Sequence, residues 1–259
     1  RSTQSRSSAA SDVYKRQIYN NMRFYRKINS LLIVLLLINT TIEAKESILV
    51  VGGTGRVGSE IVKILSAEDK KITVLSRSNN NYSRLKGLNI DYFKGDVLNE
   101  KDIERVFLAK DYDVIINALA KVGNSPNPHA LGQKNLIKWS KKTGIKHFIL
   151  IGSVGAGSKQ SELVSDIVWS MWKDILQEKG KAEASLINSN LPFTIIRTGI
   201  VVYDDTPATG NAELLEDDTI VGIITRKDLA QLTGECVLNG LCFNKIYHAF
   251  DASLGNAIE

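Results

Sequence analysis

Cysteine, proline and histidine are scarce in this sequence, and each shortage excludes a class of protein. Only two of the 259 residues are cysteines, four are prolines and three are histidines. Two cysteines exclude a disulfide-rich scaffold and a zinc site built on a cysteine cluster. The histidines lack metal-ligand spacing, so no metal site is predicted. With 43% hydrophobic residues, the composition is that of an ordinary folded domain rather than a disordered or collagen-like chain.

A basic surface is also lacking once the N-terminal segment is set aside. The net charge of +5 comes from 33 basic and 28 acidic residues. Seven of the basic and two of the acidic residues lie within 1–44, so residues 45–259 carry no formal net charge. A neutral domain offers no electrostatic case for nucleic-acid binding, and none is predicted.

The N-terminal 44 residues contain two segments that we exclude from the fold. Residues 1–21 precede Met22 and begin with a serine-rich stretch that has no apolar period, so we interpret them as a non-native or disordered leader. Residues 22–44 run from basic residues through an apolar stretch, 31–38, to Ala44, which is the order of a secretory signal or organelle-targeting segment. The stretch is short of the roughly 20 residues of a membrane-spanning helix. We expect an exported or organelle-targeted protein, cytoplasmic if this interpretation fails, and membrane association only through this segment if it stays uncleaved.

The rest of the sequence alternates apolar runs with helical patterns. Continuous apolar runs are typical of strands in a parallel sheet that is covered on both faces. The pattern therefore predicts an α/β fold of the Rossmann type: a doubly wound, mostly parallel sheet with helices on both faces, in a single domain over 45–259. The expected strands are 47–52, 71–76, 89–96, 113–120, 147–153, 193–202 and 245–250. One helix is expected directly after the glycines at 52–58, and four more are expected at 99–109, 129–144, 163–189 and 225–240.

A glycine-rich turn joins the first strand to the first helix. Gly52, Gly55 and Gly58 have the spacing G-x-x-G-x-x-G. Glycines in this place allow the sharp turn, a close approach of the backbone to a pyrophosphate, and tight packing of the helix on the strand. The N–H groups at the helix start then face the anion. The context predicts a dinucleotide site, and it includes the other residues of the turn and helix start, Thr54, Arg56 and Val57.

The end of the second strand indicates which nucleotide binds. A carboxylate there would hydrogen-bond to the ribose 2′-hydroxyl of NAD, but the sequence has Ser76-Arg77-Ser78. Arg77 is suited to pairing with a 2′-phosphate. NADP is therefore the predicted cofactor, and NAD is the less favoured alternative.

These motifs together resemble the atypical short-chain dehydrogenases/reductases of the NmrA-like, NAD(P)H-binding branch. The resemblance covers about 48–250, with a particular likeness to chloroplast-type members. It implies that Asp96 lies near the adenine amino group with Val97 beside it, and that Ala118 lies along the cofactor. The segments that carry it are VVGGTGRVG (50–58), KGDV (94–97), INALA (116–120), 132–158, KAEASLINSNLPFTIIRTG (181–199) and ITRKDLAQL (224–232).

The resemblance also implies a catalytic pair, with one departure from the usual pattern. Ser153 occupies the position of a serine that hydrogen-bonds to a substrate carbonyl, and Lys179 that of a lysine that contacts the nicotinamide ribose. The position of the usual tyrosine, a general acid, is Ile175, which cannot donate a proton. His129 and Tyr203 are two further candidate donors, although a histidine at a helix start is more often structural.

Two functions follow from this site. The preferred one is an NADP(H)-dependent oxidoreductase that transfers hydride to a small, quinone- or flavin-like acceptor, which can take its proton from water. The alternative is a non-catalytic NADP(H)-binding redox sensor or scaffold protein. We expect the substrate pocket to include the loops 121–129 and 203–218. In this fold the fifth helix often contributes to a subunit interface, which leaves a homodimer open. We expect Cys236 and Cys242 to be buried thiols rather than a disulfide.

Overall fold

The computed structural model describes residues 45–78, 81–157, 160–202 and 206–255. Residues 45–259 form one compact unit. The two predicted N-terminal segments, 1–21 and 22–44, and the candidate donor Tyr203 lie outside the described residues. None of the helices in the described ranges is long and apolar enough to cross a membrane.

Eight strands form one sheet in the order β3-β2-β1-β4-β5-β6-β10-β8. All neighbouring strands are parallel except β8, which runs antiparallel to β10. The order reverses between β1 and β4, which is where doubly wound sheets bind their ligands. The predicted Rossmann-type fold is confirmed. The strands are β1 (Ser47–Val51), β2 (Lys71–Ser76), β3 (Asp91–Lys94), β4 (Val114–Asn117), β5 (His147–Ile151), β6 (Phe193–Thr198), β8 (Ala212–Leu215) and β10 (Lys245–Asp251).

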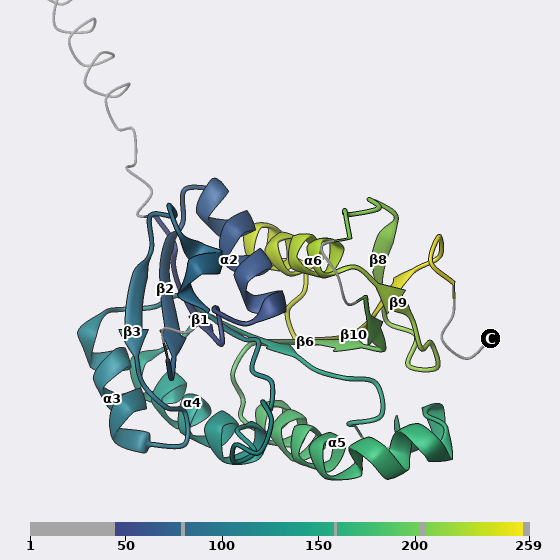
Figure 1. The fold of residues 1–259 in the computed structure, drawn as a ribbon. Coiled ribbons are helices and arrows are strands. Elements are labelled where there is room, and N and C mark those ends of the chain that lie inside the picture. The colour runs from purple at the N-terminus through teal and green to yellow at the C-terminus, as the bar shows by residue number, and fades with distance from the viewer. Residues whose placement is uncertain (1–44, 79–80, 158–159, 203–205, 256–259) are drawn as a thin grey trace, which may run out of the picture. The chain divides into compact units, whose positions relative to one another are not determined.

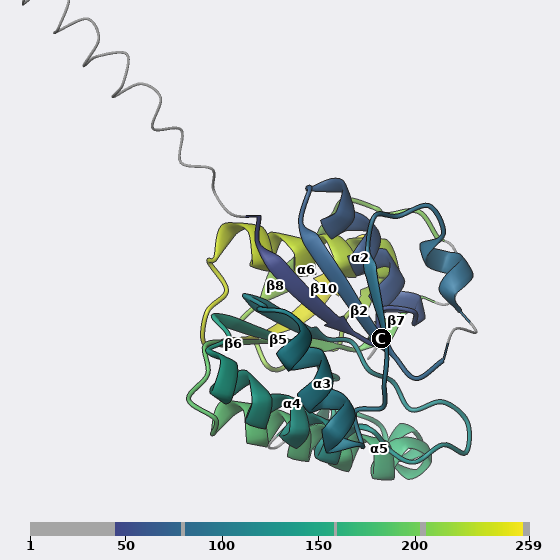
Figure 2. The ribbon, with the colours of Figure 1, turned by 90° about the vertical axis from the view of Figure 1, so that its left-hand side faces the viewer.

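Helices cover both faces of the sheet (Figure 1). Helices α2 and α6 pack together on one face, and α3, α4 and α5 lie on the other, as the view in Figure 2 also shows. Each face has its own apolar core, because consecutive strand residues point to opposite sides: Val50 belongs to the α2 side and Leu49 to the α4 side. The helices are α2 (Arg56–Ala67), α3 (Glu100–Ala109), α4 (His129–Thr143), α5 (Asp166–Ile187) and α6 (Arg226–Asn239), with short 3-10 turns η1 (Tyr82–Leu85) and η2 (Gln160–Leu163).

The predicted strand over 193–202 is two strands, and the predicted loop over 203–218 contains another. Gly199 separates β6 from β7 (Ile200–Val201), which leaves the main sheet and pairs with β9 (Ile223–Ile224). A Cβ at Gly199 would collide with the carbonyl oxygen of Gly222, so the chain crosses here at close range. Strand β8 was missed because AELL is short and has only two adjacent leucines rather than an alternating pattern.

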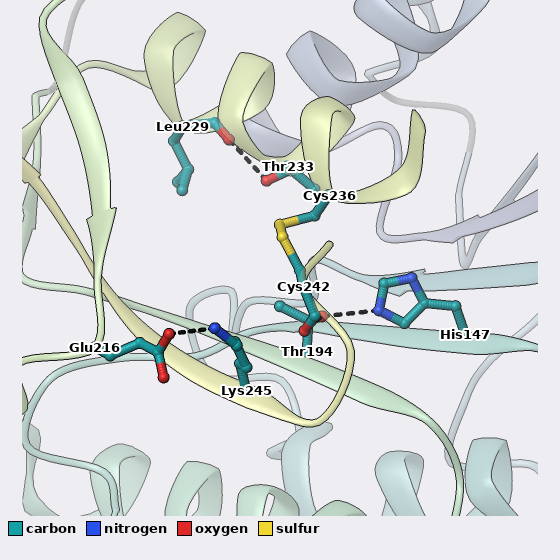
Figure 3. Close-up of a disulfide and its surroundings, with 8 residues drawn as sticks. All are labelled: His147, Thr194, Glu216, Leu229, Thr233, Cys236, Cys242 and Lys245. Atoms are coloured by element: carbon teal, nitrogen blue, oxygen red, sulfur yellow. Dashed lines mark hydrogen bonds and ion pairs between the residues drawn. A yellow bond between two sulfur atoms is a disulfide. The ribbon is translucent and has the colours of Figure 1, made fainter. Parts of the chain in front are cut away.

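The expectation of two free thiols is wrong, because Cys236 and Cys242 form a disulfide (Figure 3). Gly240 ends α6 with a positive φ of 61°, and the following turn brings the chain back, so the two Cα atoms are 5.3 Å apart. The bond ties the end of α6 to the segment before β10. It lies near Thr194 and His147 (Figure 3), at the edge of the sheet where β5, β6 and β10 begin.

Candidate functional site

The glycine turn follows β1 and is fixed by backbone geometry. Gly52 has a φ of 80°, donates its N–H to the Leu75 carbonyl and accepts from the N–H of Gly55 at 2.8 Å. A Cβ on Gly52 would stand 2.9 Å from the Ala118 carbonyl oxygen, and a Cβ on Gly58 would collide with the carbonyl oxygen of Gly52. The first and third glycines are therefore required by the close packing of β1, β4 and α2.

The N-terminus of α2 offers the donors that a pyrophosphate needs. Gly55 is the N-cap, no side chain caps the first turn and the first turn has no acidic residue. Arg56 and Val57 begin the helix directly after it. The helix dipole and the N–H groups at the helix start favour an anion at this point. The residues present therefore fit the diphosphate of a dinucleotide.

A second arginine, Arg84, lies near the glycine turn and the end of β2, the strand that the predicted Arg77 follows. Arg77 is exposed directly after β2. Arg84, in η1, donates from Nη1 to the Thr54 carbonyl at 2.9 Å, and the Thr54 hydroxyl is 2.9 Å from that of Ser76. Arg84 thus lies between the glycine turn and the end of β2. No local pattern marks Arg84, because it lies eight positions beyond the last residue of the strand.

The loop after β3 is held in place by its own hydrogen bonds. The Asp96 carboxylate accepts from the N–H of Leu98 at 3.0 Å, and Asp102 accepts from the N–H of Asp96 at 2.9 Å. Asn135 on α4 donates to the carbonyl of buried Val97 at 2.8 Å. These hydrogen bonds fix the loop after β3 and tie it to α3 and α4; the role of Asp96 and Val97 toward an adenine stays a prediction.

Strand β4 brings Ala118 next to the glycine turn. The N–H of Ala118 donates to the carbonyl of Val51 at 3.0 Å, so the chain after β4 runs beside the start of the turn. One residue earlier, Asn117 donates to Gln133 on α4 at 2.5 Å. The positions predicted from β1, β2, β3 and β4 thus lie at one edge of the sheet, that of the carboxyl ends.

Ser153 and the contact of Lys179 both lie just beyond the carboxyl end of β5. Lys179 on α5 donates to the Gly152 carbonyl at 3.4 Å, and the Ser153 hydroxyl donates to the Val154 carbonyl at 3.1 Å. Gly180 allows this approach, because a Cβ there would collide with the Ala156 carbonyl. Burial lowers the pKa of Lys179 to about 8, and the negative charge of Glu183 opposes that shift. Lys179 is therefore charged near neutral pH but titrates far below an exposed lysine.

A buried ion pair supports the same region, and the sequence analysis did not identify it. Arg197 on β6 pairs with Glu183 on α5 through two contacts, one of them Nε to Oε2 at 3.1 Å, and both side chains are buried. His248 lies 3.4 Å from the Arg197 guanidinium. Both partners fall in segments that carry the resemblance, A-E and R-T-G. They are 14 positions apart in the sequence, and no local pattern predicts their contact.

Ile175 and His129 complete the surroundings of Lys179. Ile175 lies one helical turn before Lys179 on α5 and is half-buried. His129, the first residue of α4, is 4% exposed. Burial, and secondly the positive charge of Lys179, lower the pKa of His129 to about 3. A neutral imidazole and an ammonium group therefore lie near each other where the usual tyrosine is absent.

The glycine turn and Ala118 thus lie at the carboxyl ends of β1 and β4, and Ser153 and Lys179 lie at the carboxyl end of β5, along the same edge of the sheet. The profile of a family described as NAD(P)H-binding matches residues 52–239, most of the chain, from the first glycine of the turn to the end of α6. The chain belongs to the NAD(P)H-binding family. The predicted membership of the atypical short-chain dehydrogenases/reductases is confirmed. When bound, a nicotinamide nucleotide supplies hydride chemistry at this edge.

Curated relatives support the same family. Sanguinarine reductase of Eschscholzia californica is 39% identical over 107 residues, which is 39% of this chain and 37% of that protein. An uncharacterised chloroplastic protein of Arabidopsis thaliana is 28% identical over 204 residues, 70% of this chain and 60% of that protein. The alignments thus span less than two thirds of the length of either relative.

Solved structures share the fold. ChuY of Escherichia coli O157:H7, described as an anaerobilin reductase, superposes with a TM-score of 0.72 at 23% identity, covering 82% of this chain and all of that chain. The oxidoreductase ylbE of Lactococcus lactis gives a TM-score of 0.69 at 25% identity, covering 82% of this chain and 93% of that chain. A short-chain dehydrogenase/reductase of Veillonella parvula with the same fold was solved in complex with NADP, at a TM-score of 0.62 and 14% identity, covering 81% of this chain and 96% of that chain.

Proposed function

We propose that this protein is an NADP(H)-dependent reductase that transfers hydride to a small, quinone- or flavin-like acceptor. The observation that carries the proposal is the meeting of Lys179 with the Gly152–Ser153 segment, at the same sheet edge as the glycine turn. A relative named above is a sanguinarine reductase, and this chain belongs to the NAD(P)H-binding family. In this proposal Ser153 orients the acceptor and Lys179 holds the nicotinamide ribose.

The preference for NADP over NAD rests on two arginines. Arg77 follows β2, and Arg84 reaches the turn from η1 by its bond to Thr54. A guanidinium has five N–H donors, so Arg84 can hold Thr54 and still pair with a 2′-phosphate. Together the two side chains suit a 2′-phosphate better than a ribose hydroxyl.

Calorimetry with NADPH and NADH tests the cofactor choice. We expect the purified protein to bind NADPH more tightly, and Arg77→Ala and Arg84→Ala each to weaken NADPH alone. A hydrogen bond to a charged group contributes about 1.5–3 kcal/mol, which is on the order of 10- to 100-fold in affinity. Lys101→Ala removes the same charge from the exposed surface of α3 and serves as the control. Equal loss of NADH binding in the arginine variants would contradict the assignment.

Turnover is tested by the loss of NADPH absorbance with riboflavin and menadione. We expect the wild-type protein to oxidise NADPH with at least one of these acceptors, and Ser153→Ala and Lys179→Met to slow the reaction. Tight NADPH binding without turnover would support the second candidate, a redox sensor or scaffold, which the isoleucine at position 175 favours. Failure to bind either nucleotide would contradict both.

We also propose that the chain folds in an oxidising compartment. The order of residues 22–44 is that of an export or targeting segment, and the Cys236–Cys242 disulfide is of the kind that persists where thiols are oxidised. Thiol labelling of the protein from its native source should find both cysteines blocked. Two freely labelled thiols would argue for the cytoplasm.

A homodimer through α5 is the remaining proposal. Ile167, Met171 and Trp172 are exposed on the first half of this helix, and exposed apolar clusters often mark subunit contacts. Light scattering should give twice the chain mass, and Met171→Lys should restore the monomer.

A further inference from the structure

His129 carries a buried nitrogen that the protein itself does not satisfy. The residue is 4% exposed, and its Nε2 atom has no hydrogen-bond partner within the described parts of the chain. Buried polar atoms in folded proteins are nearly always paired, and leaving one unpaired is costly. An orphaned nitrogen beside a ligand site therefore points to a ligand that satisfies it.

The other two histidines show the usual arrangement. His147 has its Nε2 atom 2.8 Å from the hydroxyl of Thr194, and His248 has its Nδ1 atom 2.6 Å from the carbonyl of Ile220. Both are buried, and both have their pairing supplied by the fold. His129 differs from them in this respect, and it is also the histidine whose pKa is lowered by Lys179.

The position of His129 is set by the elements that build the site. It opens α4, and its N–H donates to the Asn127 side chain at 3.1 Å, which fixes the helix start. Four residues on, Gln133 pairs with Asn117 at the end of β4. Helix α4 packs along α5, which carries Lys179. The first turns of α4 therefore lie beside the end of β4, and Lys179 on α5 is near enough for its charge to affect the imidazole.

We propose that His129, as a neutral imidazole, hydrogen-bonds to the reducible group of the substrate. It would take the hydrogen-bonding role of the usual tyrosine, which Ile175 cannot play. This inference rests on the proposed function and names a substrate-binding residue for it. The substrate class is a compound with a carbonyl oxygen or an imine-type nitrogen at the reducible centre. Ser153 and His129 would approach that atom from β5 and α4.

The chemistry balances without titration of the imidazole. A bound nicotinamide nucleotide would supply two electrons and one hydrogen as hydride, and the acceptor oxygen or nitrogen would take its proton from water. His129 donates a hydrogen bond to the atom on which negative charge develops and keeps its own proton. A preorganised neutral donor in a buried site stabilises developing charge effectively. Within the described residues, the charge that acts on His129 is that of Lys179 on α5, and Lys179 is in turn influenced by Glu183, which pairs with Arg197 on β6.

Imidazole NMR gives a test that does not depend on activity. The chain has three histidines, so ¹⁵N-histidine labelling gives three ring systems, of which His147 and His248 are internal controls. We expect no imidazolium signal from His129 above pH 5, and a shift of its Nε2 resonance when menadione or riboflavin is added to the protein saturated with NADP⁺. The two control rings should not move.

Two variants separate substrate binding from a structural role. We expect His129→Leu to lower kcat/KM by on the order of 10- to 100-fold, with the NADPH Kd unchanged within about twofold. His129→Gln, which keeps an amide donor, should recover part of that loss. Thermal melts of the two variants show whether either change merely unfolds the protein.

The outcomes distinguish this inference from the proposed function. An Nε2 shift on acceptor binding in a protein that shows no turnover would support the contact with His129 and contradict the proposed reductase activity. A shift with NADP⁺ alone would assign His129 to the cofactor and overturn the inference. Normal turnover by His129→Leu with a motionless Nε2 resonance would also overturn it, and would leave a trapped water as the partner of the nitrogen.

Discussion

Strands β1–β4 and strands β5–β10 carry the two parts of the candidate site, and the two parts are built differently. In the first, glycine positions, helix dipole and backbone N–H groups prepare the nucleotide edge, and few side chains are needed. In the second, buried side chains do the positioning: Lys179 on the Gly152 carbonyl, and Glu183 paired with Arg197. The first part is sensitive to added atoms, and the second to the removal of charge.

Breaking the buried ion pair between Glu183 and Arg197 should have the largest effect on stability, because it removes a charge from the second part. Glu183→Gln leaves the Arg197 guanidinium buried without its carboxylate, so we expect the free energy of unfolding to fall by about 3–5 kcal/mol. Denaturant unfolding followed by circular dichroism measures the change.

The matched control for that variant removes both charges. Glu183→Leu combined with Arg197→Met should be much more stable than Glu183→Gln, because apolar residues replace a desolvated pair. If the double variant is no more stable than the single one, the loss in Glu183→Gln does not come from the uncompensated charge of Arg197.

Gly52→Ala tests the backbone part of the site. Alanine at this positive φ is strained, and its Cβ would also lie only 2.9 Å from the Ala118 carbonyl oxygen. We expect a combined effect of about 3 kcal/mol, which is on the order of 100-fold in NADPH affinity. Calorimetric titration of the variant measures it.

Gly87→Ala is the control, because Gly87 has a similar φ of 85° but no atom within 4 Å of the built Cβ. It should cost about 1–2 kcal/mol of stability with NADPH affinity unchanged. Equal effects of the two substitutions on NADPH binding would contradict the claim that the close approach of Gly52 to β4 matters for the affinity.

The disulfide lies at the edge where β5, β6 and β10 begin, opposite the cofactor edge, and should affect stability alone. Replacing Cys236 and Cys242 by serine opens a short loop, so the free energy of unfolding should fall by about 2 kcal/mol. The Kd for NADPH should stay within twofold in the same preparation. A large loss of NADPH affinity would connect the two edges and contradict their separation.

Acidification gives the smallest effect. Burial lowers the pKa of His147 to about 4, and burial with the charge of Lys179 lowers that of His129 to about 3. Both stay neutral when folded but gain protons near pH 6.5 when unfolded, so stability is full above pH 6.5 and is lost as the pH falls toward 4. Between pH 7 and 6 each should cost roughly 0.7 kcal/mol. His147→Gln should remove its share in urea melts, and an unchanged slope would contradict the assignment.

The sequence predicted the fold around the glycine turn well, because its signals are local. Gly52, Gly55 and Gly58 fall within seven residues, the strands are continuous apolar runs, and Asn99 and Gly144 act as the helix caps that their residue types indicate. Propensity, turn chemistry and hydrophobic pattern all agree there, which is the condition for reading structure from sequence.

The remaining features depend on contacts between distant segments. Arg84 reaches Thr54 across 30 residues and Arg197 meets Glu183 across 14, and no local pattern encodes either. The cysteines were misjudged for the same reason: their pairing needs the reversal after Gly240, which the sequence alone does not disclose. Strand β8 is formed by its antiparallel pairing with β10, and its own sequence has no alternating pattern that would predict a strand.

Hydrogen exchange on adding NADPH tests the central claim most directly, because it observes both edges of the sheet in one experiment. With the nucleotide at saturation, we predict slower amide exchange in 52–58, 95–98 and 118–119, and unchanged exchange in 241–246 beside the disulfide. Saturable binding with no protection in 52–58, or with protection centred on 241–246, would contradict the claim that the nucleotide lies at the carboxyl ends of β1–β4.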